Sequence, residues 1–153
     1  MVTYISKEQY EKLKQELEYL KTVTRKQVAE RLKNAAEMGD ISENAEYDIA
    51  MAEKENLEIK IAELENVLRT AKIIRDSKVN DRILPGKKFD VVEKGTNKKY
   101  TFNLVGFGES NPSEGKVSTD SPLGKAFLNK KIGDEVIVQA PKGKIIYIVK
   151  KIY

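Results

Sequence analysis

The sequence contains neither cysteine nor histidine, and this excludes several kinds of catalytic and metal site. Without cysteine there can be no disulfide bond, no thiolate nucleophile and no cysteine-ligated zinc or iron–sulfur cluster. Without histidine the commonest base and metal ligand at neutral pH is missing. Any chemistry must therefore use carboxylates, lysines, hydroxyls or a metal ion held by oxygen ligands.

Long hydrophobic segments are also absent from the sequence. The longest unbroken apolar run is residues 145–149, whereas a helix that spans a bilayer needs roughly 20 apolar residues. The first six residues have neither the basic segment nor the apolar segment of a secretion signal. We therefore expect a cytoplasmic protein that does not enter a membrane.

Charge is distributed unevenly along the 153 residues. Residues 1–76 contain 13 basic and 16 acidic side chains, whereas residues 77–153 contain 15 basic and 8 acidic side chains. An acidic first part and a basic second part indicate two regions of different kind.

The first part has the pattern of a helical hairpin. Ser6 and Gln9 have the spacing of a capping box, which marks a helix start. Two apolar stripes with helical spacing follow. They comprise Tyr10, Leu13, Leu17, Leu20, Val28, Leu32 and Ala35, and then Leu57, Ile61, Leu64, Leu68 and Ala71. Gly39 is the only glycine or proline before Pro85, so we expect the turn at Gly39 or close after it. Residues 1–76 are thus predicted to form an antiparallel coiled-coil finger with its tip at 39–48.

The second part has the pattern of a β-rich domain. After a linker at residues 77–81, residues 82–153 are enriched in β-branched and aromatic residues. We expect one hairpin from strands 89–93 and 99–105, and a second from strands 136–139 and 144–152. Ser121 and Pro122 predict the start of a short helix that ends near Leu128. The fold class is therefore α+β.

The predicted tip is crowded with uncompensated acid. No basic residue lies between Lys33 and Lys54, but six carboxylates do. They are Glu37, Asp40, Glu43, Glu46, Asp48 and Glu53. Solvation of an exposed tip is one explanation. The other is a site for Mg2+, to which Asp40 and Glu43 would supply two oxygen ligands while a partner supplies the rest.

Two segments resemble the signatures of a known family. Residues 39–48, GDISENAEYD, resemble the tip signature of the GreA/GreB transcript cleavage factors of bacterial RNA polymerase. Residues 121–126, SPLGKA, and 131–136, KIGDEV, resemble the second signature of that family. Glu46 before Tyr47 is more similar to the GreA branch than to the GreB branch. The resemblance covers nearly the whole chain.

The resemblance implies a fold and a function. The coiled coil would enter the secondary channel of bacterial RNA polymerase, and a C-terminal FKBP-like domain would dock at the channel mouth. Asp40 and Glu43 match the two acidic residues that help to hold a Mg2+ ion jointly with the polymerase and that orient the attacking water. The polymerase then cleaves the 3′ end of nascent RNA in backtracked complexes, which rescues arrested elongation. The protein itself would be no enzyme, would bind no metal alone and would act as a monomer.

Other residues receive roles from the same resemblance. Asn44, Glu46 and Tyr47 would support the tip. Ser121, Pro122 and Leu123 would form a docking surface, although Ser121 is also explained as an ordinary helix start. Four basic residues of the first helix would contact RNA, or form a solvated helix face. They are Arg25, Lys26, Arg31 and Lys33. Ala36 and Met51 stand where the family often has basic residues.

Two other functions are considered. A binder of the same channel could inhibit the polymerase without promoting cleavage, but such relatives usually have altered tips, and Asp40 and Glu43 are both present here. An FKBP-like fold also raises prolyl isomerase activity, which needs an aromatic-lined pocket. The second part contains few aromatic residues and no tryptophan, so this function is not favoured.

Overall fold

The computed structural model describes residues 2–39 and 44–153, and the chain divides into two compact units. One unit is Tyr10–Thr70, and the other is Ala71–Tyr153 together with the first residues as far as Gln9. The first residues belong to the same unit as residues 71–153, because β1 (Thr3–Ile5) pairs in parallel with β2 (Ala71–Ile73). Among the described residues, none of the helices is both long enough and apolar enough to cross a membrane.

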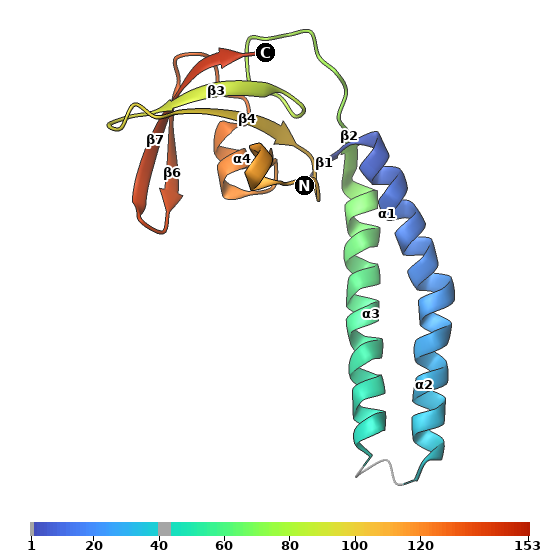
Figure 1. Ribbon diagram of the computed structural model, residues 1–153. Coiled ribbons are helices and arrows are strands. Elements are labelled where there is room, and N and C mark those ends of the chain that lie inside the picture. Colours follow the sequence, from blue (N-terminus) through green and yellow to red (C-terminus); the bar gives the residue numbers. More distant parts are fainter. Residues whose placement is uncertain (1, 40–43) are drawn as a thin grey trace. The chain divides into compact units, whose positions relative to one another are not determined.

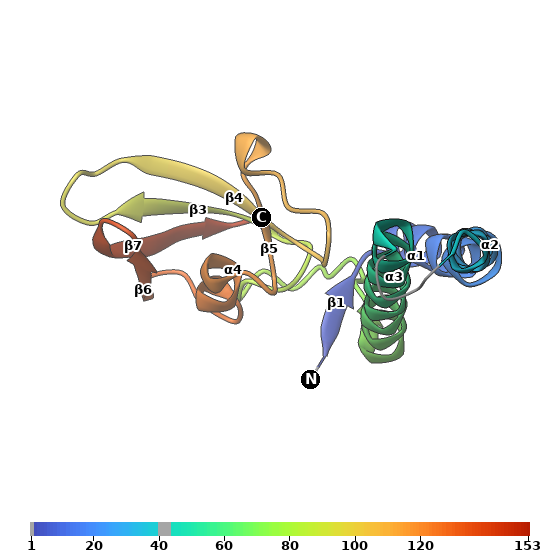
Figure 2. The same cartoon turned by 90° about the horizontal axis from the view of Figure 1, so that it is seen from below.

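The first unit is the predicted helical hairpin. Its first arm comprises α1 (Lys7–Tyr19), a π-helical turn (Leu20–Thr24) and α2 (Arg25–Glu37), and its second arm is α3 (Ala45–Thr70). The two arms lie side by side in both views (Figures 1 and 2). The Ser6 hydroxyl accepts a hydrogen bond from the Gln9 backbone N–H at 3.1 Å, which confirms the predicted start of the first helix.

Apolar packing holds the two arms together. Val28 packs with Leu57 and Ile61, and Leu17 and Leu20 border this cluster. Among the described residues, four ion pairs join the arms at their exposed edges. They are Glu16 with Lys60, Lys21 with Glu65, Arg25 with Glu58, and Arg31 with Glu53. Exposed ion pairs contribute at most about 1 kcal/mol each, so the apolar seam is the main source of stability.

The second unit contains a five-stranded sheet with the order β5-β4-β3-β7-β6. The strands are β3 (Lys88–Glu93), β4 (Lys99–Val105), β5 (Lys116–Ser118), β6 (Glu135–Ala140) and β7 (Gly143–Ile152). A short 3-10 helix (Pro112–Glu114) precedes β5, and α4 (Pro122–Phe127) follows it. Both predicted hairpins are present as β3–β4 and β6–β7, whereas the parallel pairing of β5 with β4 was not predicted.

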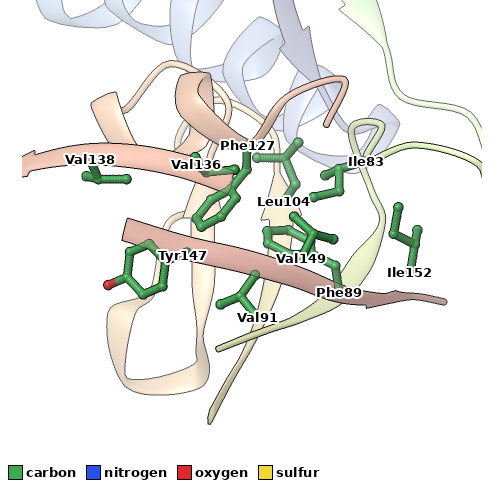
Figure 3. Packing of buried hydrophobic residues seen from close by; sticks show 10 residues of the cluster. All are labelled: Ile83, Phe89, Val91, Leu104, Phe127, Val136, Val138, Tyr147, Val149 and Ile152. Atoms are coloured by element: carbon green, nitrogen blue, oxygen red, sulfur yellow. The ribbon is translucent and has the colours of Figure 1, made fainter. Parts of the chain in front are cut away.

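Aromatic rings fill the space between α4 and the sheet. Phe89 and Phe127 are fully buried, and their ring centroids lie 4.9 Å apart (Figure 3). Leu104 and Val149 complete the centre of this core. Because both phenylalanine rings are enclosed by the core, they cannot line an open pocket for a prolyl substrate.

Candidate functional site

The two carboxylates that the sequence singles out, Asp40 and Glu43, lie outside the described residues. The candidate site is therefore built from the residues that precede and follow them. These are the end of α2 with Gly39 on one side, and Asn44 with the first turn of α3 on the other.

The first arm ends in a conformation that favours glycine. The Met38 backbone N–H donates to the Ala35 carbonyl at 3.2 Å, and Gly39 follows with φ at +138°. A Cβ atom at Gly39 would meet no atom of the described residues within 4 Å, so the constraint is backbone strain and not lack of space. The predicted position of the turn is thus confirmed at its first residue.

Asn44 connects the ends of the two arms. Its side-chain oxygen accepts a hydrogen bond from the Tyr47 backbone N–H at 3.2 Å, so Asn44 is the N-cap of α3. Its side-chain amide donates to the carbonyl oxygen of Ala35, which lies in the last turn of α2. One side chain therefore satisfies polar backbone groups at both helix ends.

The described carboxylates around the tip differ in their surroundings. Glu37, Glu46 and Asp48 are exposed, and Glu46 and Asp48 lie in the first turn of α3, where negative charge is favourable. Glu53 pairs with Arg31 on the opposite arm. Within residues 2–39 and 44–153, no three acidic groups come together as a metal site. The carboxylates of Asp40 and Glu43 are the hard oxygen donors that suit Mg2+, and two such ligands still require others from a partner.

Apolar side chains that the sequence patterns did not predict also lie at this end of the hairpin. Met38 is 75% exposed and Ile49 is 56% exposed. Both border a cavity of about 230 Å³ between the arms. The other lining residues are Arg31, Asn34, Ala35, Glu46, Ala50 and Glu53. In the sequence, Met38 and Ile49 stand out as apolar residues within an acidic segment, and this contrast could have indicated them.

The four basic residues that were predicted to contact RNA fall into two groups. The Arg25 guanidinium donates twice to Glu58, at 2.9 and 2.8 Å, and holds the pKa of that carboxyl below its usual value. Arg31 similarly pairs with Glu53. Lys26 and Lys33 are exposed. Sequence alone could not separate these groups, because the partners are on the other arm.

Ser121, Pro122 and Leu123 open α4. The Ser121 hydroxyl accepts from the Gly124 N–H at 3.0 Å and donates to the Ser118 carbonyl at 2.7 Å, which makes it the predicted helix cap. Leu123 packs against the core. Pro122 is exposed at the first helical position. Ser121 and Leu123 thus have structural partners, and Pro122 faces solvent.

The chain matches known families over almost its full length. Residues 3–73 match the N-terminal domain of the GreA/GreB transcription elongation factors, and residues 78–153 match their C-terminal domain. These two matches follow the order of the helical hairpin and the sheet-bearing unit. Together they define the chain as a transcription elongation factor. The chain belongs to the GreA/GreB family.

The chain is also similar to individual proteins. Transcription elongation factor GreA of Geobacillus kaustophilus is 48% identical over 143 residues, which cover 93% of this chain and 90% of that protein. Transcription elongation factor GreA of Bacillus subtilis is 46% identical over 142 residues, with coverage of 93% and 90%. The crystal structure of GreA factor homolog 1 of Thermus thermophilus is 26% identical, covers 100% of this chain and 99% of that one, and has a TM-score of 0.46.

Proposed function

We propose that this protein is a transcript cleavage factor of bacterial RNA polymerase. Its hairpin enters the secondary channel and brings Asp40 and Glu43 to the active centre, where the polymerase hydrolyses the 3′ end of nascent RNA in backtracked complexes. The observation that supports this most is the position of the acidic segment between two antiparallel helices. α3 has 26 residues, so at 1.5 Å per residue the arm is about 39 Å long. An arm of this length can carry a small acidic group deep into a narrow channel.

The chain would contribute ligands and orientation to the reaction. Asp40 and Glu43 would supply carboxylate oxygens to a Mg2+ ion that the polymerase also holds, and the free protein would bind none. A bound Mg2+ activates water and stabilises the leaving oxygen in phosphoryl hydrolysis. The carboxylate of either residue can also accept a hydrogen bond from the attacking water and so orient it. Catalysis would remain a property of the polymerase.

Residues next to the pair would support it. Asn44 fixes the start of α3 through its bonds to Tyr47 and Ala35. Exposed Glu46 adds negative charge close to the proposed ligands. Asn44, Glu46 and Tyr47 are therefore proposed to hold the tip in a conformation that presents Asp40 and Glu43.

The remaining proposals concern contacts with the polymerase complex. Residues 1–76 would act as the finger, 77–81 as a linker and 82–153 as the docking domain, whose excess of basic residues would favour an acidic surface. Pro122 would make direct contact at the channel mouth, with Ser121 and Leu123 positioning it. The exposed Lys26 and Lys33 would contact RNA phosphates, and Arg25 and Arg31 would do so only in addition to their ion pairs. We expect a cytoplasmic monomer.

The experiment is an RNA cleavage assay on a backtracked elongation complex with Mg2+. It compares no factor, the wild type and the double variant Asp40→Asn, Glu43→Gln. We expect acceleration by the wild type alone, with equal affinity of both proteins for the polymerase. The matched control is Glu37→Gln, Asp48→Asn, which removes two negative charges from the same region and should retain activity.

The possible results separate the functions considered. Full stimulation by the Asp40→Asn, Glu43→Gln variant would show that the ligand assignment is wrong. If the wild type displaces a ligand of the channel without accelerating cleavage, the protein is an inhibitory binder. Loss of activity in the control variant would mean that total charge matters and not the particular pair.

A further inference from the structure

The apolar seams of the two arms have different spacings. In α3 the buried residues Ala50, Leu57 and Leu64 recur at intervals of seven. In the first arm the seam consists of the buried residues Leu13, Val28 and Ala35 and of the partly buried Leu20. Their intervals along the chain are seven, eight and seven. The first arm therefore carries one residue more than the seam requires, between Leu20 and Val28.

An extra residue has a large effect in an unbroken α-helix. Each residue turns the helix by about 100°, so everything after the insertion would rotate by that angle. Val28 and Ala35 would then leave the seam. Both are nevertheless buried, with exposed fractions of 6% and 5%. The extra residue must therefore be absorbed before Val28.

The π turn lies within the interval from Leu20 to Val28, where the extra residue has to be accommodated. It covers Leu20–Thr24, and the Arg25 N–H donates to the Leu20 carbonyl, which closes a loop one residue longer than an α-helical turn. Regular α-helix precedes and follows it. The segment contains no glycine or proline to which the irregularity could be attributed. The spacing mismatch supplies the physical reason for it.

We propose that this π turn accommodates a one-residue insertion and thereby positions the tip. It keeps α2 in phase with α3, so that Arg31 meets Glu53 and the Ala35 carbonyl meets the Asn44 amide. Leu20–Thr24 is thus a positioning element for Asp40 and Glu43, although it lies at the middle of the arm. This last link depends on the proposed function, and the phase argument does not.

Two single-residue deletions test the proposal. Val23 lies inside the π turn and is 38% exposed, and Ala29 is exposed within α2. Deletion of Val23 restores intervals of seven, and we expect a melting temperature within about 3 °C of the wild type, as for a surface substitution. Deletion of Ala29 either rotates Ala35 out of the seam or places Gln27 where Val28 packs. We expect it to lower the melting temperature by at least about 5 °C.

A cross-linking measurement reports the phase directly. The chain has no cysteine, so Ala35→Cys and Ala50→Cys introduce the only two thiols, and both positions line the cavity near the tip. A short bis-maleimide should join them equally fast in the parent and in the Val23 deletion. In the Ala29 deletion the rate should fall, because Ala35 has turned away or the seam has loosened.

Cleavage stimulation adds the functional readout. The Val23 deletion should stimulate as the wild type does, and the Ala29 deletion should lose about 100-fold through misplacement of the tip. If the Val23 deletion is as unstable and as slowly cross-linked as the Ala29 deletion, the π turn does not keep α2 in phase with α3. If the wild type does not stimulate cleavage, the proposed function fails, while melting and cross-linking still decide the phase argument.

Discussion

The side-chain amide of Asn44 donates a hydrogen bond to the backbone carbonyl of Ala35, and this bond joins the start of α3 to the end of α2. The same side chain caps α3 through the Tyr47 N–H. The residues on both sides of 40–43 are therefore tied to each other by one asparagine. This arrangement gives Asn44 two separable functions, one as a cap and one as a bridge.

Substitution of Asn44 should separate the cap from the bridge. Asn44→Ala removes both interactions and should destabilise the hairpin by about 1–3 kcal/mol. Asn44→Asp keeps a cap acceptor but has no donor for the Ala35 carbonyl, so the loss should be smaller. Thermal unfolding measures stability, and the cleavage assay shows whether the bridge alone affects activity. Wild-type stability of Asn44→Asp would show that the bridge contributes nothing, and equal stability of the two variants would show the same of the cap.

Substitution of the exposed lysines of the first arm should affect transcript binding, whereas substitution of a paired arginine should affect stability. Lys26→Ala with Lys33→Ala should weaken the salt-sensitive part of the interaction with the transcript and leave the melting temperature unchanged. Arg25→Ala should instead lower the melting temperature slightly, because it breaks the exposed pair with Glu58. Glu58→Gln is the matched control and should reproduce the Arg25→Ala loss of stability. The measurements are thermal unfolding and the salt dependence of cleavage.

Gly124 should tolerate no side chain. A Cβ atom at this position would lie 1.8 Å from the Ser118 carbonyl oxygen, which is backbone and cannot rotate away. Gly124→Ala should therefore destabilise the second unit by more than about 3 kcal/mol or prevent its folding. The neighbouring exposed Lys125→Ala should change stability by less than about 0.5 kcal/mol. Denaturant unfolding of the two variants provides the comparison, and a stable Gly124→Ala protein would contradict the close approach.

Asp90 should make the stability of the second unit depend on acid pH. Hydrogen bonds from Thr101 at 2.7 Å and from the Tyr153 hydroxyl at 2.8 Å hold the pKa of Asp90 below its usual value, with Lys151 and Lys88 adding to the effect. The unfolded chain then binds a proton at a higher pH than the folded one does. The contribution is present above about pH 4 and is lost as pH falls through the folded pKa.

The test is Asp90→Asn, followed by unfolding free energies between neutral and acid pH. This variant should be less stable near neutral pH and should lose less stability on acidification than the wild type. Asp76→Asn removes the same charge from an exposed position and should leave the acid dependence unchanged. An identical acid dependence in the wild type and in Asp90→Asn would exclude the role of this network.

The features predicted from sequence are those with a local physical cause. Leu57, Ile61 and Leu64 repeat at helical spacing, Gly39 supplies a backbone conformation that other residues avoid, and Ser121 precedes Pro122 as a helix start. Each signal is contained within a few neighbouring residues. The hairpin, the turn and α4 could therefore be predicted.

The features that were missed depend on partners far along the chain. β1 and β2 have three residues each, too few for a periodic pattern. They pair with each other although the whole hairpin separates them in the sequence. The Asn44 bridge requires knowledge of which carbonyl lies opposite. The π turn is different, since the eight-residue interval from Leu20 to Val28 was already visible in the sequence. The assignment of Asp40 and Glu43 rests on the resemblance and stays a prediction.

The parallel pair β1–β2 makes the hairpin an insertion within the other unit. Thr3 lies opposite Ala71 and Ile5 opposite Ile73, so the chain leaves for the hairpin and returns from it at neighbouring points. The segment between β1 and β2 can therefore be replaced as one piece that is attached at two fixed points. Chimeras that carry the hairpin of another family member should therefore fold without rerouting the chain, and evolution can change the tip while the sheet that receives it stays the same.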